Sequence, residues 1–234
     1  MSSISQIEDK ELGILTLKSH SRARRFTFRP TADGIVITLP QGTSVEEFWA
    51  ALEKVRSRLR LLKEKCHTTI IDLNYTLSCD YFKLSLVEGK VNRFLASSGS
   101  DTLTIVCPID TDFRQPILQE WLRKVISEAL RCRAKEILPQ RLRELSLQSG
   151  LSYKSIRING SRSRWGSCST AKNINLSYYL LLLPTHLIDY VLLHELAHTQ
   201  EMNHGEKFWA LLHRLTDGKA QLLRTELKNY KTGI

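Results

Sequence analysis

The sequence predicts an α+β protein with a strand-rich amino-terminal part and a mainly helical carboxy-terminal part. Up to Pro108, short runs of apolar residues alternate with polar ones, which is typical of half-buried strands. After Pro108 the apolar residues take helical spacing, with Pro116 near the start of the first helix. We therefore expect two domains, residues 1–108 and residues 109–234.

The amino-terminal part contains two groups of strand candidates. The first group lies between residues 12 and 39. Ser44 followed by Glu47 resembles a capping box and predicts a helix that runs to about Lys65. The second group comprises TTIIDLNYTL, YFKLSLVEG, KVNRFLA and TLTIVCP. One helix is therefore expected between the two groups.

The carboxy-terminal part is expected to contain helices and two short strands. The helix that begins near Pro116 should break or kink at Pro139, because proline has no amide hydrogen to donate to the helical ladder. A second helical segment then ends at Gly150. The remaining elements are strands around residues 155–159 and 173–177, with the turn-rich SRSRWGSCSTAK between them, and helices that begin at Pro184 and near Gly205.

Composition and charge limit the class of protein. The formal charge of +10 and the pI near 9.5 favour anionic partners, although a solvated basic surface gives the same balance. The polar, acidic start does not predict a secretory signal, and the longest apolar run, YYLLLL, is far below the roughly 18 residues of a membrane span. The five cysteines form no CxxC pair, which fits reduced thiols in a cytoplasmic protein.

The helix expected after Pro184 contains the sequence HExxH. The spacing of His194 and His198 places both imidazoles on one helix face, one turn apart, where they can bind one metal ion. Glu195 projects about 100° around the axis from His194, near enough to deprotonate a metal-bound water without being a ligand. The other residues of this helix are mostly apolar, so it should be buried. A metal ion would satisfy all three polar side chains.

A catalytic zinc ion usually has three protein ligands and one open position. His204 is the expected third ligand, because Asn203 can adopt a left-handed conformation that ends the helix and returns the chain toward the first two histidines. Glu201 and Glu206 are the alternatives. Imidazole sites accept several divalent transition metals, so zinc is expected and manganese or nickel stays open.

The spacing of the three histidines equals that of the metzincins, which form one alternative class. Two features oppose this assignment. The position of the metzincin turn glycine is occupied by Glu201, and no methionine follows Met202 to provide a Met-turn.

Four motifs are more specific than HExxH alone: SRWGSCS, INLSYYLLLLP, IDYVLLHELAH and NHGEKFW. With them the chain resembles the YgjP-like metallopeptidase-domain family, relatives of the SprT-like and minimal gluzincin proteins, most strongly over residues 115–215. The resemblance implies a zincin-like catalytic part, with His194, His198 and His204 as metal ligands and Glu195 as general base. It also implies a short sheet beside the active-site helix, whose edge can pair with an extended substrate backbone.

The resemblance implies a zinc-dependent metallohydrolase and leaves two substrate classes open. The family name implies a metallopeptidase that acts on an extended polypeptide. Some relatives are described as nucleoside triphosphate pyrophosphatases that act on UTP, and a triphosphate needs several cations around it. Arg157, Arg162 and Arg164 lie in one short segment, with Trp165 available to stack on a base. These four are the expected substrate-binding residues. Members of the family typically have lysine at the position of Arg162, so the positive charge is kept there.

A non-catalytic metal module associated with nucleic acid is a third alternative. It is less favoured, because the basic residues of the helix after Gln115 alternate with glutamates. That alternation predicts ion pairs on a solvated helix face. The sequence indicates no membrane partner and no particular oligomeric state.

Overall fold

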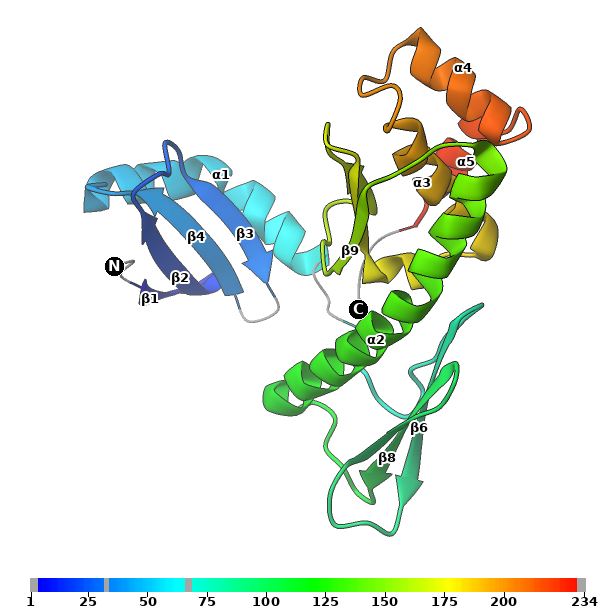
Figure 1. Cartoon of the computed structure of the whole chain (residues 1–234). Helices are drawn as coiled ribbons and strands as arrows, with labels where there is room; N and C mark the ends of the chain where they lie inside the picture. Colours follow the sequence, from blue (N-terminus) through cyan, green and yellow to red (C-terminus); the bar gives the residue numbers. More distant parts are fainter. Residues whose placement is uncertain (1–3, 32–33, 66–68, 231–234) are drawn as a thin grey trace. The chain divides into compact units, whose positions relative to one another are not determined.

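The structure, a computed structural model, describes residues 4–31, 34–65 and 69–230 (Figure 1). The predicted α+β class is confirmed. The chain divides into two compact units, Met1–Thr69 and Ile70–Ile234, each with its own hydrophobic core. This division differs from the boundary expected at residue 108, because the second group of strands shares one core with the long helix that follows it.

In the first unit a helix covers one face of a four-stranded sheet (Figure 1). The strands are β1 (Ile4–Asp9), β2 (Gly13–His20), β3 (Thr27–Thr31) and β4 (Gly34–Pro40), in the order β1-β2-β4-β3. The helix is α1 (Val45–Lys65), and its capping box is confirmed. The Glu47 amide donates to Ser44 Oγ, and the Ser44 amide donates to Glu47 Oε2, both at 3.1 Å.

The second unit begins with another four-stranded sheet, in the order β5-β6-β8-β7. Its strands are β5 (Leu77–Cys79), β6 (Phe82–Gly89), β7 (Leu95–Ser98) and β8 (Thr102–Pro108). The strand expected over TTIIDLNYTL is wrong for residues 69–76 and holds at Leu77, where β5 begins; Thr68 lies outside the described residues. Ile71 is buried, yet its backbone amide and carbonyl bond the side-chain amide of Gln119 at 2.9 and 2.8 Å. The Gln119 side chain therefore satisfies the Ile71 backbone groups that a neighbouring strand would otherwise bond.

Of the break or kink expected at Pro139, the break is wrong, because helix α2 (Pro116–Ser149) is one continuous helix. Leu138 and Leu142 are fully buried on either side of the proline. The carbonyl that loses its donor belongs to Lys135, on the exposed side of the helix. Burial of two leucines is worth about 1.5–3 kcal/mol each, which offsets the roughly 3 kcal/mol that an internal proline costs. The helix ends at Gly150, as predicted, with φ of 69°.

The basic residues of α2 pair with carboxylates, as the alternating charges predict. Arg131 binds Glu128 at 2.6 Å, and Arg133 binds Glu136 at 2.8 Å. The ion pairs expected on this helix face are therefore confirmed for these residues.

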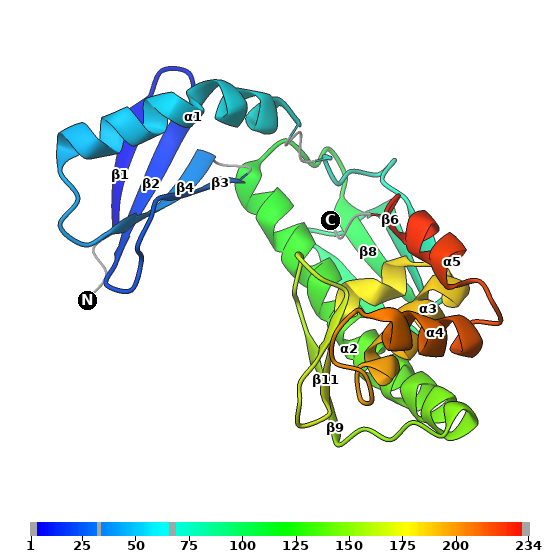
Figure 2. The same ribbon diagram turned by 90° about the horizontal axis from the view of Figure 1, so that it is seen from above.

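A three-stranded sheet and four short helices complete the second unit. The strands are β9 (Ser155–Asn159), β10 (Gly166–Cys168) and β11 (Asn173–Ser177), in the order β10-β11-β9. The helices are η1 (Tyr178–Leu182), α3 (Thr185–Ala197), α4 (Glu206–Leu215) and α5 (Ala220–Leu227), and Figure 2 shows α3 beside α4 and α5. Strands β9 and β11 were predicted, whereas β10 lies in the segment expected to be turns.

Helix α3 is buried on most of its circumference, as its apolar sequence predicts. Two polar contacts fix it from a distance in the sequence. Asp80, in the turn between β5 and β6, accepts hydrogen bonds from the Thr185 backbone nitrogen (2.8 Å) and hydroxyl (2.6 Å). Arg141 of α2 binds both carboxylate oxygens of Asp189 at 2.7 Å. No helix among the described residues is both long enough and apolar enough to cross a membrane.

We predict that Asp80→Ala lowers the free energy of unfolding by about 1 kcal/mol, because it removes the cap of α3. Urea denaturation measures this change. The pKa of Asp80 is lowered by the hydrogen bonds from the Thr185 side chain and backbone. The stabilisation is therefore complete above the ordinary aspartate pKa of 3.8 and is lost as the pH falls through the lowered value.

A matched control is Glu120→Ala, which removes an exposed carboxylate from α2. Its stability change should be small at every pH. A loss for Asp80→Ala no greater than that of Glu120→Ala would contradict the capping role.

Candidate metal centre

The HExxH motif lies on a helix, as predicted. His194 and Glu195 belong to α3, and His198 is its C-cap residue. The Nε2 atoms of His194, His198 and His204 converge, with pairwise distances of 3.2, 3.2 and 3.1 Å. Three nitrogens bound at about 2.0–2.1 Å to one tetrahedral ion would lie about 3.3–3.4 Å apart. Among the described His, Cys, Asp and Glu side chains, these three form the group that can hold a metal.

The protonation of the histidines fits the same role. His198 Nδ1 lies 3.0 Å from the carbonyl oxygen of Glu201, which can only accept a hydrogen bond. Nδ1 therefore carries the proton, and Nε2 presents its lone pair to the cluster, as in many metal-ligating histidines. Burial lowers the pKa of His194 to about 3, and burial also lowers the pKa of His198. Uncharged rings at His194 and His198, with nitrogens that converge on one point, fit a divalent transition-metal ion.

His204 reaches the cluster by a different route from the one expected. Asn203 is not left-handed; the described non-glycine residues with positive φ are Asp110, Lys172 and Asp217. After α3 the chain turns through hydrogen bonds to Leu196 and Ala197, and the Gly205 amide donates to the Asn203 carbonyl at 2.8 Å. Successive turns, rather than one left-handed residue, therefore return the chain to the first two histidines.

Two aromatic residues of α4 hold the three rings. Phe208 is fully buried, and its ring centroid lies 4.9, 4.5 and 4.7 Å from those of His194, His198 and His204. Trp209 Nε1 donates to the His204 carbonyl oxygen at 3.1 Å. Arg224 of α5 stacks on the Trp209 ring at 4.8 Å. The sequence analysis assigned no role to these residues, although Phe208 and Trp209 end the quoted motif NHGEKFW.

Glu195 is the buried carboxylate beside the histidines, with 5% of its surface exposed. Its Oε2 atom has no hydrogen-bond partner among the described residues. Burial raises the pKa of Glu195 to about 8, and the positive charge of Arg164 opposes this rise. A buried carboxylate with a vacant acceptor atom is costly for stability alone, which favours a chemical role.

Strand β10 contacts this carboxylate directly through a glycine. A Cβ atom on Gly166 would lie 2.6 Å from Oε1 and 2.8 Å from Cγ of Glu195, too close for any real contact. The strand can approach α3 only because no side chain intervenes. No role was expected for Gly166, although it stands in the quoted motif SRWGSCS.

The other candidate residues lie around this centre. The carboxylates of Glu201 and Glu206 do not join the histidine group. Arg157, Arg162 and Arg164 are exposed, and Arg162 Nε donates to the Tyr179 hydroxyl at 3.0 Å. Trp165 is partly buried against the main core. The four described cysteines, Cys79, Cys107, Cys132 and Cys168, are free thiols, and Cys66 lies outside the described residues.

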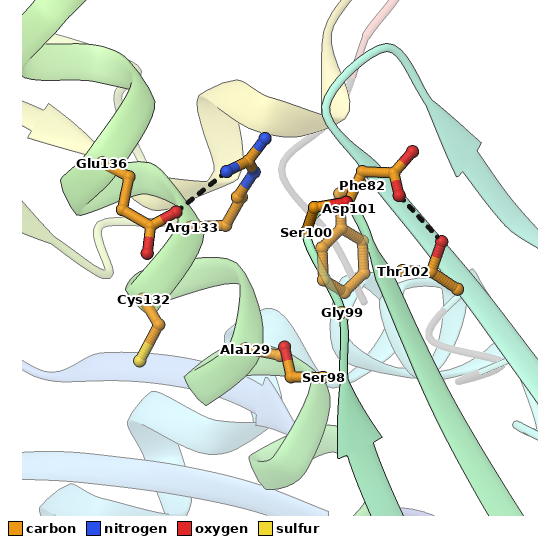
Figure 3. Close-up of a pocket in the computed structure, with 10 residues that line it drawn as sticks. All are labelled: Phe82, Ser98, Gly99, Ser100, Asp101, Thr102, Ala129, Cys132, Arg133 and Glu136. Atoms are coloured by element: carbon orange, nitrogen blue, oxygen red, sulfur yellow. Dashed lines mark hydrogen bonds and ion pairs between the residues drawn. The ribbon is translucent and has the colours of Figure 1, made fainter.

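A separate pocket of about 140 Å³ lies between α2 and the turn from β7 to β8 (Figure 3). Its charged groups already have partners, since Arg133 binds Glu136 and Asp101 accepts a hydrogen bond from Thr102. None of the three histidines lines it. The histidine group is therefore the candidate site.

Comparison with known proteins places this site in a family. A search of the curated proteins finds no match. Among solved structures, the metallopeptidase zymogen of abylysin from Pyrococcus abyssi aligns with 21% identity and a TM-score of 0.37, over 40% of this chain and 93% of that chain. The family described as YgjP-like, metallopeptidase domain, matches residues 24–230. The chain therefore belongs to the YgjP-like metallopeptidase-domain family.

Proposed function

We propose that this chain is a zinc-dependent peptidase in which His194, His198 and His204 hold the ion and Glu195 is the general base. The observation that carries the proposal is the convergence of three Nε2 atoms beside a buried carboxylate that has a vacant oxygen. Membership of a metallopeptidase-domain family supports a metal-dependent hydrolase and favours a polypeptide substrate.

The residues of the site divide the chemistry between them. A zinc ion on three imidazoles supplies a Lewis acid that activates water and polarises a carbonyl group. The vacant Oε2 of Glu195 accepts the proton of the attacking water and returns it to the leaving amine. Phe208 and Trp209 keep the imidazoles in place, so that the geometry exists before substrate binds.

The open edge of β10 supports a peptide as the substrate. Strand β10 pairs with β11 on one side, and no strand of the described part of the chain pairs with its other side. An extended polypeptide can add to such an edge through backbone hydrogen bonds. Because Gly166 of this strand touches Glu195, a peptide bound there would pass beside the general base.

Hydrolysis of a nucleoside triphosphate is the alternative activity, based on Arg157, Arg162, Arg164 and Trp165. Two observations favour a peptide instead. Arg162 is bound to Tyr179 and lies 5.5 Å above its ring, and Trp165 packs against the core. Pyrophosphate release from nucleoside triphosphates by the zinc-loaded protein, without cleavage of any polypeptide, would favour the alternative.

We predict that Glu195→Gln lowers kcat for cleavage of unfolded polypeptides by about 100-fold or more, because general-base catalysis contributes about 10²–10⁴-fold. The zinc content should stay near one ion per chain, since the three imidazoles are unchanged. Turnover of quenched peptides and elemental analysis measure the two quantities. Retained turnover would remove Glu195 from the reaction.

We predict that His204→Ala lowers the zinc content after dialysis against a weak chelator, because one of three ligands is lost. His213→Ala is the matched control, since His213 is exposed on α4 and outside the histidine group. Equal zinc content in the two variants would point to Glu201 or Glu206 as the third ligand.

We predict that Gly166→Ala lowers kcat at least tenfold and leaves the zinc content unchanged, because the new methyl group displaces the Glu195 carboxylate. Gly99→Ala is the control, since a Cβ atom there would meet its nearest atom, the Thr102 carbonyl oxygen, at an ordinary 3.5 Å. If Gly166→Ala kept the activity of Gly99→Ala, the contact between β10 and the carboxylate would have no catalytic role.

A further inference from the structure

The segment that forms the three-stranded sheet beside the metal centre carries only positively charged side chains. Between Glu144 and Asp189 the sequence contains no aspartate or glutamate, and it contains five lysines and arginines. All of them are exposed: Lys154, Arg157, Arg162, Arg164 and Lys172. Lys154, Arg157, Arg164 and Lys172 take part in none of the ion pairs found among the described residues. On α2, by contrast, arginines and glutamates pair with one another.

Two of these cations flank the open strand. Arg164 lies just before the strand, two residues from Gly166, and Lys172 follows Cys168 in the turn to β11. Gly166 touches Glu195, so this end of the strand lies against α3.

Both cations lie close enough for their charges to act on groups at the α3 side of the strand. Arg164 acts on Glu195, and Lys172 acts on Cys168.

The segment that follows the first two histidines differs in charge from the strand side. The segment after α3 and the first turn of α4 carry both signs, with Glu201, Glu206 and Lys207. An extended chain on β10 would therefore meet positive charge along the strand and a balanced surface beyond the histidines.

We propose that the cationic edge, defined as β10 with Arg164 and Lys172 at its ends, selects extended polypeptides with acidic side chains near the scissile bond. This inference rests on the proposed peptidase function. Carboxylates would bind the Arg164 guanidinium through two hydrogen bonds and would be steered by the field of the sheet. A polypeptide is favoured over nucleic acid, because the strand edge offers backbone hydrogen bonds and Trp165 packs against the core.

The test uses three quenched peptides of equal length that differ only in having glutamate, glutamine or lysine at the same four positions. With the zinc-loaded full chain, kcat/KM for the glutamate peptide should exceed that for the lysine peptide at least tenfold at low ionic strength. The ratio should fall in high salt, because exposed charges are screened. Arg164→Gln with Lys172→Gln should reduce the ratio to about twofold.

The matched control is Arg58→Gln with Arg60→Gln, which removes the same charge from the exposed face of α1. This control should keep the full preference. Loss of the preference in the control would assign it to net charge and overturn the role of the edge.

The remaining outcomes separate this inference from the function on which it rests. Equal cleavage of the three peptides contradicts the selection and leaves the peptidase intact. If no peptide is cleaved, the peptidase fails, and the anisotropy of labelled peptides on the Glu195→Gln variant still tests the selection. A single-stranded DNA oligonucleotide that displaces the glutamate peptide and binds more tightly would make the edge a nucleic-acid surface and overturn the proposal.

Discussion

The second unit is organised around a carboxylate buried in an apolar helix. Glu195 has one oxygen that no described residue bonds, and apart from His194 its nearest neighbours along α3 are apolar. Burying a polar group without compensation costs about 1–3 kcal/mol. Contacts around α3 must offset this free-energy cost. Arg141 of α2 binds the helix, and Asp80 caps it. Gly166 allows β10 to lie directly against the carboxylate. Buried titratable groups of this kind are typical of functional sites.

The three imidazoles are positioned by packing more than by their own hydrogen bonds. Phe208 lies against all three rings, and Trp209 fixes the backbone of His204, the histidine of the three that lies farthest along the chain from α3. The base of the centre is thus an aromatic side chain of the next helix, where a metzincin would use a methionine turn. Arg224 on Trp209 extends the support to α5, so the last helices of the chain contribute to ligand geometry.

Local signals in the sequence were sufficient for much of the fold and the centre. The capping box at Ser44, strands β9 and β11, and the end of α2 at Gly150 depend on neighbouring residues alone. Features set by distant contacts were missed. Helix α2 continues through Pro139 because its leucines pack in the core. The Gln119 side chain takes the place of a strand partner beside Ile71. Strand β10 pairs with β11 and lies against α3. The hydrophobic periodicity of a short sequence segment does not indicate contacts with residues far away in the chain.

The central claim is that three imidazole nitrogens, and no sulfur, hold a zinc ion beside Glu195. Zinc K-edge X-ray absorption of the zinc-loaded protein tests it most directly. The account predicts three nitrogen neighbours with imidazole multiple scattering and one further light atom, at about 2.0–2.1 Å. A sulfur neighbour at about 2.3 Å would place Cys168 in the centre, and a shell with two imidazoles would remove His204; either result contradicts the account.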